Sequence, residues 1–291
     1  MIKAKAATVV SAKWLARKIS EKSSIRILDG SYHLPNANRN AKAEYQHEHI
    51  PGALFFDIDE CSDVEIPLPH MLPSTNHFEN YVGSTLGIDN NTHVVIYDTN
   101  EDFGLFSAPR VWWTFRVFGH DNVSILDGGI PKWRSLGLPV TQQLITTPRR
   151  VFSATYRPHL VKNFEQVAQN INTQECLVVD ARSKERFEGT GPEPRPGIRS
   201  GHFSGARNIP FQSIMDLSTK TIMDTNQLIK LFQENNVDLN QPLFASCGTG
   251  LTACCISLAA FLCGKEDVAV YDGSWTEWAQ KAKPIQILSG P

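Results

Sequence analysis

The sequence predicts an α/β protein made of two tandem copies of one module, each a mainly parallel sheet flanked by helices. Short β-branched runs alternate with amphipathic helical stretches along the chain, and the same segments recur in both halves. A chain of 291 residues with 41% hydrophobic content is long enough for two separate cores. We therefore expect an N-terminal domain at 1–141 and a C-terminal domain at 159–291. A linker is expected at 142–158, where the periodicity breaks.

The internal repeat can be followed segment by segment. Each half also has a tryptophan near its end, Trp133 in the first and Trp278 in the second. The matching segments are 26–29 with 177–180, 49–53 with 202–206, 93–98 with 243–247, and 125–129 with 270–274. The halves are therefore expected to share one topology.

The elements follow in chain order. Residues 11–19 indicate a first helix capped by Ser11, although the basic, acid-free stretch 1–20 would also fit a mitochondrial presequence; we favour the helix. The apolar runs of the repeat are expected to be the strands. Further helices are expected at 108–118, 164–172, 226–235 and 254–262.

The loop between the strand at 242–246 and the helix at 254–262 carries the clearest chemical signal. It begins with Cys247, followed by Gly248. N–H groups of such a loop and helix N-terminus point at one spot and favour negative charge, and the thiolate is the nucleophilic form of cysteine. We predict that Cys247 is the nucleophile. The first half has Asp98 at this position, so we expect it to be catalytically silent and to supply side chains to a cleft between the modules.

The other five cysteines lack this context, and simple core packing is the expected role of each. They are Cys61, Cys176, Cys254, Cys255 and Cys263. Six cysteines without framework spacing indicate a reducing compartment. A cytoplasmic location is therefore expected, with a mitochondrial one as the alternative.

The spacing of the loop argues against phosphate-ester hydrolysis. Cysteine phosphatases need an arginine six positions after the nucleophile to clamp the phosphoryl oxygens, and here that position is Ala253. The loop has no charged side chain, which suits an uncharged or singly anionic sulfur donor better than a dianion such as thiosulfate. Sulfur transfer through a persulfide on Cys247 is the chemistry that remains.

Composition and motifs limit the other function classes. A net charge of -2 and a pI near 6.5 give no reason to expect nucleic acid or an anionic membrane as a partner. No run is long enough to span a bilayer. No histidine pair shows metal-ligand spacing, so neither a metal nor another cofactor is expected.

The chain resembles the rhodanese superfamily of sulfurtransferases over nearly its whole length, and its mercaptopyruvate-using branch most of all. The resemblance is carried by the segments 57–59, 70–73, 107–113, 193–195 and 271–275 and by the Cys247 loop. A loop similar to Cys-Gly-Ser-Gly-Val-Thr marks that branch, and this chain departs from it only at Thr249 and Leu251.

The resemblance implies roles for further residues. Arg186 and Arg195 would clamp the carboxylate and keto oxygen of mercaptopyruvate; the alternative is that these charges of a Gly/Pro-rich loop are merely solvated. Thr249, His70 and Asp59 would form a proton relay, unless His70 is an ordinary loop histidine. The donor would also contact the loop residues Gly248, Gly250, Leu251 and Thr252. Three other arginines are expected to be surface charges: Arg182, Arg199 and Arg207.

The resulting hypothesis is a sulfurtransferase that moves sulfur from 3-mercaptopyruvate to an acceptor and releases pyruvate. The acceptor would be a small thiol, cyanide or a reduced thioredoxin-type protein. One alternative is an enzyme of the same fold that uses thiosulfate and cyanide. Another is a non-catalytic rhodanese module that senses or scaffolds, against which the intact Cys247 argues.

Overall fold

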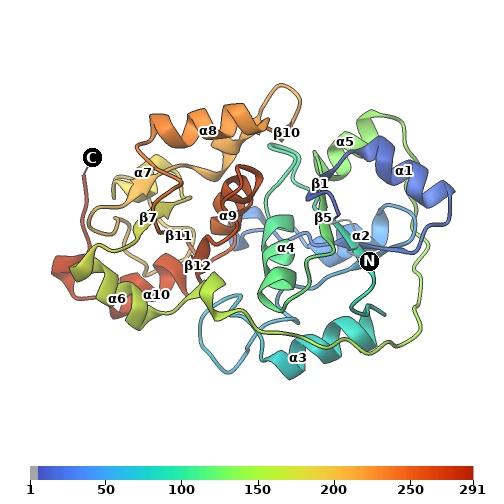
Figure 1. Cartoon of the computed structure of the whole chain (residues 1–291), viewed down its shortest axis with the longest axis horizontal. Helices are drawn as coiled ribbons and strands as arrows, with labels where there is room; N and C mark the ends of the chain where they lie inside the picture. Colours follow the sequence, from blue (N-terminus) through green and yellow to red (C-terminus); the bar gives the residue numbers. More distant parts are fainter. Residues whose placement is uncertain (1–5, 291) are drawn as a thin grey trace.

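The computed structural model describes residues 6–290, which form two neighbouring α/β domains (Figure 1). Each domain is built on a five-stranded sheet in which all neighbouring strands are parallel, with helices on its faces. The strand orders are β1-β5-β4-β2-β3 and β6-β12-β11-β7-β8, so each strand of one domain has a counterpart in the other. The expected pair of parallel sheets flanked by helices is confirmed.

The N-terminal domain contains the first five strands. They are β1 (Val9–Val10), β2 (Ile25–Asp29), β3 (Ala53–Phe55), β4 (His93–Tyr97) and β5 (Val123–Leu126). Its helices are α1 (Ala12–Ser20), η1 (Pro35–Ala37), α2 (Ala41–His47), α3 (Thr75–Asn80), the π-helical turn η2 (Tyr81–Thr85), α4 (Ala108–Val117) and α5 (Gly129–Ser135).

The C-terminal domain repeats this plan and adds a short antiparallel hairpin, β9 (Met215–Asp216) and β10 (Thr221–Ile222). Its sheet strands are β6 (Val161–Lys162), β7 (Leu177–Asp180), β8 (Arg207–Asn208), β11 (Leu243–Ser246) and β12 (Ala269–Tyr271). Its helices are η3 (Pro158–Leu160), α6 (Phe164–Thr173), α7 (Lys184–Phe187), η4 (Phe211–Ile214), α8 (Thr225–Glu234), α9 (Ala253–Leu262), α10 (Ser274–Lys281) and η5 (Pro284–Gln286).

The helices predicted from periodicity form within one residue of their expected bounds, and local capping explains where several begin. The Ser11 side chain accepts a hydrogen bond from the Trp14 N–H at the start of α1. Reciprocal capping boxes open α6, through Asn163 and Gln166, and α8. The basic stretch 12–20 is therefore part of the folded domain, whereas Lys3 and Lys5 lie outside the described residues.

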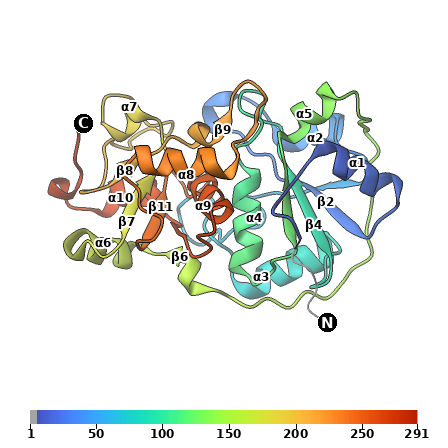
Figure 2. The same cartoon turned by 45° about the horizontal axis from the view of Figure 1, so that its top comes forward.

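The two domains meet along α4 and α9, which lie against each other in both views of the molecule (Figures 1 and 2). Both helices are apolar over most of their surface, and every residue of α4 is buried. The Trp112 ring packs edge-on against Phe261 at 5.3 Å, so aromatic contacts cross the boundary. One hydrophobic cluster runs through both domains, which fixes their relative position.

The segment between the domains is extended and packed against the N-terminal domain. Phe152 is buried against the ring of Phe78, and the Arg150 N–H donates to Gly83 O at 2.9 Å. The Thr155 N–H donates to Phe118 O at 3.0 Å. A linker held by backbone hydrogen bonds limits hinge motion between the domains. The exact boundaries at 142–158 stay a prediction.

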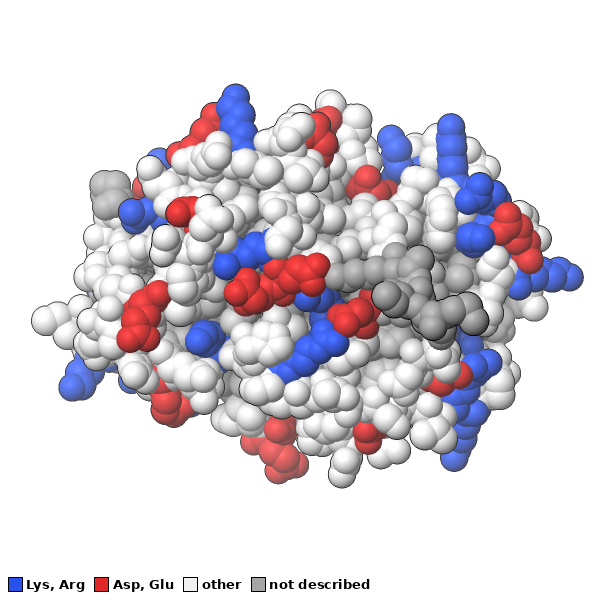
Figure 3. All heavy atoms as spheres, viewed as in Figure 1, with Lys and Arg blue, Asp and Glu red and all other residues white. Residues whose placement is uncertain are grey.

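The surface carries acidic and basic side chains interspersed over the face shown in Figure 3. Between residues 6 and 290, no helix combines the length and the apolar character that crossing a bilayer requires.

Candidate active site

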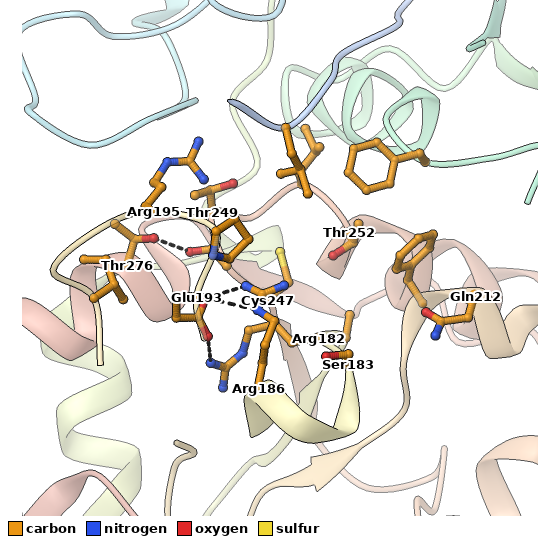
Figure 4. Close-up of a pocket in the computed structure, with 18 of the residues that line it drawn as sticks. Arg182, Ser183, Arg186, Glu193, Arg195, Gln212, Cys247, Thr249, Thr252 and Thr276 are labelled. Carbon is orange, nitrogen blue, oxygen red and sulfur yellow. Dashed lines mark hydrogen bonds and ion pairs between the residues drawn. The ribbon is translucent and has the colours of Figure 1, made fainter. Parts of the chain in front are cut away.

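Cys247 is the first residue after β11, and its sulfur lies in a cavity of ≈ 250 Å³ at the carboxyl edge of the C-terminal sheet (Figure 4). The residue is only 2% exposed. Ligand sites of open parallel sheets form at this edge. The register pairs Ser246 with Asp180, so the loops that follow β11 and β7 leave the sheet side by side and both line the cavity.

Three backbone carbonyl oxygens of the loop accept hydrogen bonds from residues outside the loop. The first turn of α10 donates backbone N–H groups to Cys247 O and Gly248 O, each at 2.9 Å. The Nη1 of Arg110, from the other domain, donates to Gly250 O at 3.1 Å. With these carbonyl oxygens engaged, the loop is held in one conformation.

The N–H groups of residues 248–252 have no hydrogen-bond acceptor among the described residues. They belong to a short loop that ends at the N-terminus of α9, where the helix dipole also favours an anion. This arrangement favours a negative group of a bound substrate.

Glu193 joins two arginines beside Cys247. Its Oε2 accepts from Arg186 Nε at 3.1 Å and Nη2 at 2.5 Å, and its Oε1 accepts from Arg182 Nη1 at 2.7 Å. The chain of contacts continues from Arg182 to Asp180 with a 2.6 Å ion pair at the end of β7. Figure 4 shows the carboxylate of Glu193 between the guanidinium groups of Arg186 and Arg182, with Arg186 on the side of Cys247. The orientation of Arg186 is therefore fixed by buried groups behind it.

The expectation that Arg182 is a surface charge is wrong. The residue is 1% exposed, and its guanidinium lies 4.2 Å from the centroid of the Trp275 ring. Burial by itself disfavours the charged form, but the carboxylates of Asp180 and Glu193 more than offset this and raise the pKa of Arg182. Arg199 and Arg207 are exposed, as expected.

Arg195 lines the same cavity but forms no ion pair with a described carboxylate. Its Nη2 lies 3.5 Å from the Tyr32 hydroxyl of the N-terminal domain. The carboxylates of Asp180 and Glu193 thus pair with Arg182 and Arg186, whereas Arg195 reaches the cavity without an ion pair among the described residues.

The structure brings His70 and Asp59 together, with His70 Nδ1 2.9 Å from Asp59 Oδ1. Burial lowers the pKa of His70, so the imidazole is neutral at pH 7, and the contact with His70 lowers the pKa of Asp59. His70 is 3% exposed and has a φ of 62°, a conformation that is strained for this residue and common at functional sites. Neither ring nitrogen has a hydrogen-bond partner among the described residues, so Nδ1 is close to Asp59 Oδ1 without the geometry of a hydrogen bond.

Thr249 lines the cavity, but none of the hydrogen bonds within the described chain joins it to His70. Gly248, Leu251 and Thr252 also line the cavity, whereas Gly250 faces Arg110 instead. The assignment of all these residues to catalysis or donor binding stays a prediction.

The N-terminal domain closes one side of the cavity with apolar side chains that sequence reasoning did not identify. Phe103 and Phe106 pack edge-on against Phe211 of the C-terminal domain at 5.3 and 5.4 Å, and Leu34 lies beside them. These contacts exclude water from one wall of the site, which strengthens electrostatic interactions inside it.

The remaining cysteines have environments unlike that of Cys247. Burial raises the pKa of Cys61, Cys254, Cys255 and Cys263, which keeps these thiols protonated at neutral pH. Cys254 donates its S–H to Gly250 O at 3.2 Å. Within residues 6–290, no cluster of three or more His, Cys, Asp or Glu side chains could hold a metal ion.

Comparisons with known proteins agree with this geometry. The model of the rhodanese-like domain matches residues 11–136 and 163–281, one copy in each domain. The chain is 49% identical to the 3-mercaptopyruvate sulfurtransferase of Rattus norvegicus, covering 97% of this chain and 95% of the relative. It is 50% identical to the thiosulfate sulfurtransferase of Mus musculus, with the same coverage of 97% and 95%.

A solved structure extends the likeness to the fold. The crystal structure of SseA from Escherichia coli, a 3-mercaptopyruvate sulfotransferase, superposes with a TM-score of 0.82 at 34% identity, covering 93% of this chain and 99% of that chain. Family model, close relatives and fold all point to one class of enzyme. The chain belongs to the rhodanese family and is a sulfurtransferase.

Proposed function

We propose that the enzyme moves a sulfur atom from 3-mercaptopyruvate to a thiol or cyanide acceptor through a persulfide on Cys247. One observation carries the proposal: Cys247, Arg186 and Arg195 line the same cavity. The N–H groups of residues 248–252, in the same loop as Cys247, have no acceptor among the described residues. The thiol can be held as a thiolate while the guanidinium groups orient an anionic donor beside it.

Two displacements at sulfur complete the reaction. The Cys247 thiolate attacks the thiol sulfur of the donor, an S–S bond forms, and the donor's C–S bond breaks. The electron pair of that bond goes to carbon as the enolate of pyruvate, which takes a proton. An acceptor thiolate or cyanide then attacks the outer sulfur of the persulfide, and Cys247 leaves as the thiolate. The second step yields a persulfide or thiocyanate.

The preference for a mercaptopyruvate donor is inferred from charge. Overall identity favours neither donor, because relatives named for mercaptopyruvate and for thiosulfate are 49% and 50% identical. Gly248 and Thr249 carry no charge, and Glu193 already neutralises part of the charge of Arg186. Arg195, which has no ion pair among the described residues, suits the single carboxylate of mercaptopyruvate better than a dianion. Thiosulfate is the second candidate donor because of the relative that bears its name.

Proton transfer to the leaving carbon is assigned to Thr249, His70 and Asp59. His70 Nδ1 lies 2.9 Å from Asp59 Oδ1, and Thr249 lines the cavity. We expect Thr249→Val to lower kcat for mercaptopyruvate by about a hundredfold, whereas Thr249→Ser keeps the hydroxyl and most of the activity. Equal kinetics for the two variants would remove Thr249 from the relay.

The deciding experiment compares kcat/KM of the wild type for mercaptopyruvate and thiosulfate, with cyanide as common acceptor. We expect mercaptopyruvate to be the better donor, and intact-mass spectrometry after donor treatment to show one added sulfur, located on Cys247 by peptide mapping. A higher kcat/KM for thiosulfate would overturn the donor assignment, and an adduct on Cys254 or Cys263 would overturn the assignment of Cys247 as nucleophile.

Repeating the assay with reduced thioredoxin and with small thiols ranks the acceptors. The six free thiols fit a cytoplasmic location, where such acceptors are reduced.

A further inference from the structure

Arg110 belongs to the N-terminal domain but ends beneath the Cys247 loop of the other domain. It lies in the first turn of α4 and is 3% exposed. Besides Gly250 O, its guanidinium contacts Asp272 Oδ1 at 2.8 Å and the backbone oxygen of His70. One buried cation of the domain without the nucleophile thus joins the Cys247 loop, the loop after β12 and the segment that carries His70.

The contact with Gly250 determines which way the loop's peptide groups face. Gly250 has a φ of +70°, and a Cβ there would lie 2.8 Å from Arg110 Nη1 and 2.8 Å from Asp272 O. Only glycine allows this approach without strain. Because Arg110 draws the carbonyl of Gly250 outward, the neighbouring N–H groups stay directed to the cavity side.

The charge of Arg110 also acts on the nucleophile. Burial by itself opposes a charged guanidinium, but attraction to the Asp272 carboxylate works against this, and the pKa of Arg110 is raised. A buried cation in turn favours negative charge in the loop that it holds. Asp272 limits the effect because its carboxylate pairs with Arg110, while its second oxygen accepts from the Leu72 N–H at 2.8 Å.

We propose that Arg110 is a positioning residue for Cys247: it holds the loop through Gly250 and supplies positive charge that favours the thiolate, and Asp272 sets how much of that charge the sulfur feels. This proposal rests on the proposed role of Cys247 as nucleophile. It gives the N-terminal domain a direct part in activating a thiol that this domain does not contain.

The test is the pH dependence of Cys247 alkylation by iodoacetamide in the full-length enzyme, followed by peptide mass spectrometry. Arg110→Gln is expected to move the midpoint of the alkylation profile up by about one pH unit, and Asp272→Asn to move it down. General loosening of the loop would move both midpoints in the same direction. Shifts of the same sign, or none, would overturn the proposal.

Two further variants test whether misfolding, rather than loss of the Arg110 charge, causes a shift of the midpoint. Arg116→Gln removes a second buried arginine of α4, which instead contacts Glu266 O and the Phe261 ring, and should leave the midpoint unchanged. If Arg110→Gln does not fold because it leaves Asp272 unpaired, the double variant Arg110→Gln/Asp272→Asn removes both charges. Its midpoint should lie above that of Asp272→Asn, and equal midpoints would contradict the proposal. Wild-type alkylation at another cysteine would instead refute the role of Cys247.

Discussion

The two domains end their central strands in the same kind of loop but put different groups in it. After β4, Asp98 Oδ2 accepts hydrogen bonds from the N–H groups of Phe106, Ser107 and Ala108, each at 2.8 Å. After β11, the N–H groups of residues 248–252 have no acceptor within residues 6–290, and Cys247 is the first residue of the loop. The fold therefore builds a site for negative charge in each copy. The first copy fills that site with its own carboxylate, and the second leaves it open for chemistry.

The two domains also differ in the residues beside the aspartate that ends their second strand. Asp29 ends β2 and Asp180 ends β7, and both are fully buried. Two residues later the first copy has Ser31, which donates to Asp29 Oδ1 at 2.5 Å, and the second has Arg182, which pairs with Asp180. Arg182 in turn holds Glu193 and Arg186. Arg182, where the first domain has Ser31, therefore supports the residues of the proposed donor site.

The largest expected effect comes from replacing Cys247, the proposed nucleophile of the second domain. Cys247→Ser should lower turnover by roughly 10⁴-fold or more while the far-UV circular dichroism stays unchanged, since serine cannot carry a persulfide sulfur. Adding Asp98→Cys to that variant should not restore activity, because the first domain has Ser31 where the second has Arg182, the arginine that supports Glu193 and Arg186. A sulfurtransferase assay measures both variants. Recovered turnover in the double variant would show that the N-terminal loop is catalytically competent.

The next effect concerns Arg182 and its counterpart Ser31. Arg182→Gln leaves the carboxylate of Asp180 buried without its cation and leaves Glu193 paired with Arg186 alone, which should lower the free energy of unfolding by about 3–5 kcal/mol. Ser31→Ala removes only a hydrogen bond and should cost about 1 kcal/mol. Urea denaturation compares the two. Similar losses would mean that the arginine network adds no stability beyond ordinary packing.

These differences also explain what the sequence could and could not predict. The alternation of strands and helices predicts the doubled fold because each module repeats the same apolar pattern. Cys247 is predicted because its signal is local, a strand, a cysteine, a glycine and a helix start in one short segment.

The supporting arginines have no such local signal. Arg182 looks like a loop charge until the register of β7 with β11 places it behind the cavity. Arg110 meets Gly250 only because α4 packs on α9, and the two residues are 140 positions apart in the chain. Which arginines are buried is decided by the packing of distant elements, and a single sequence does not contain that information.

A smaller effect is expected from Arg195, the arginine proposed to bind the donor, than from the changes above, and exposed Arg199 serves as its control. Arg195→Lys keeps the charge but loses the planar fork, so kcat/KM for mercaptopyruvate should fall tenfold to a hundredfold, or about 1.5–3 kcal/mol. Arg199→Lys changes an exposed arginine of the same loop and should leave kcat/KM unchanged. If the Arg195 variant kept wild-type kinetics, the donor carboxylate would bind elsewhere.

The smallest effect lies in the N-terminal domain and depends on pH. Burial raises the pKa of Asp29 from an ordinary value of 3.8 to about 7, with Asp98 adding to the rise and Ser31 and Tyr97 opposing it. Between about pH 4 and pH 7 the folded chain keeps a proton that the unfolded chain has lost, so this residue lowers stability as the pH rises through that window.

Asp29→Asn removes this titration while its amide oxygen can still accept from Ser31. The variant should match the wild type in urea denaturation at pH 4.5 and exceed it at pH 8 by roughly 1–3 kcal/mol, the cost of burying a carboxylate whose Oδ2 has no hydrogen-bond partner among the described residues. Asp180→Asn, at the matching position, should instead destabilise at pH 8 because it removes the partner of Arg182. If the curves of Asp29→Asn and the wild type run parallel across the pH range, Asp29 is ionised in the folded domain, and the two strand-end aspartates carry the same charge despite their different neighbours.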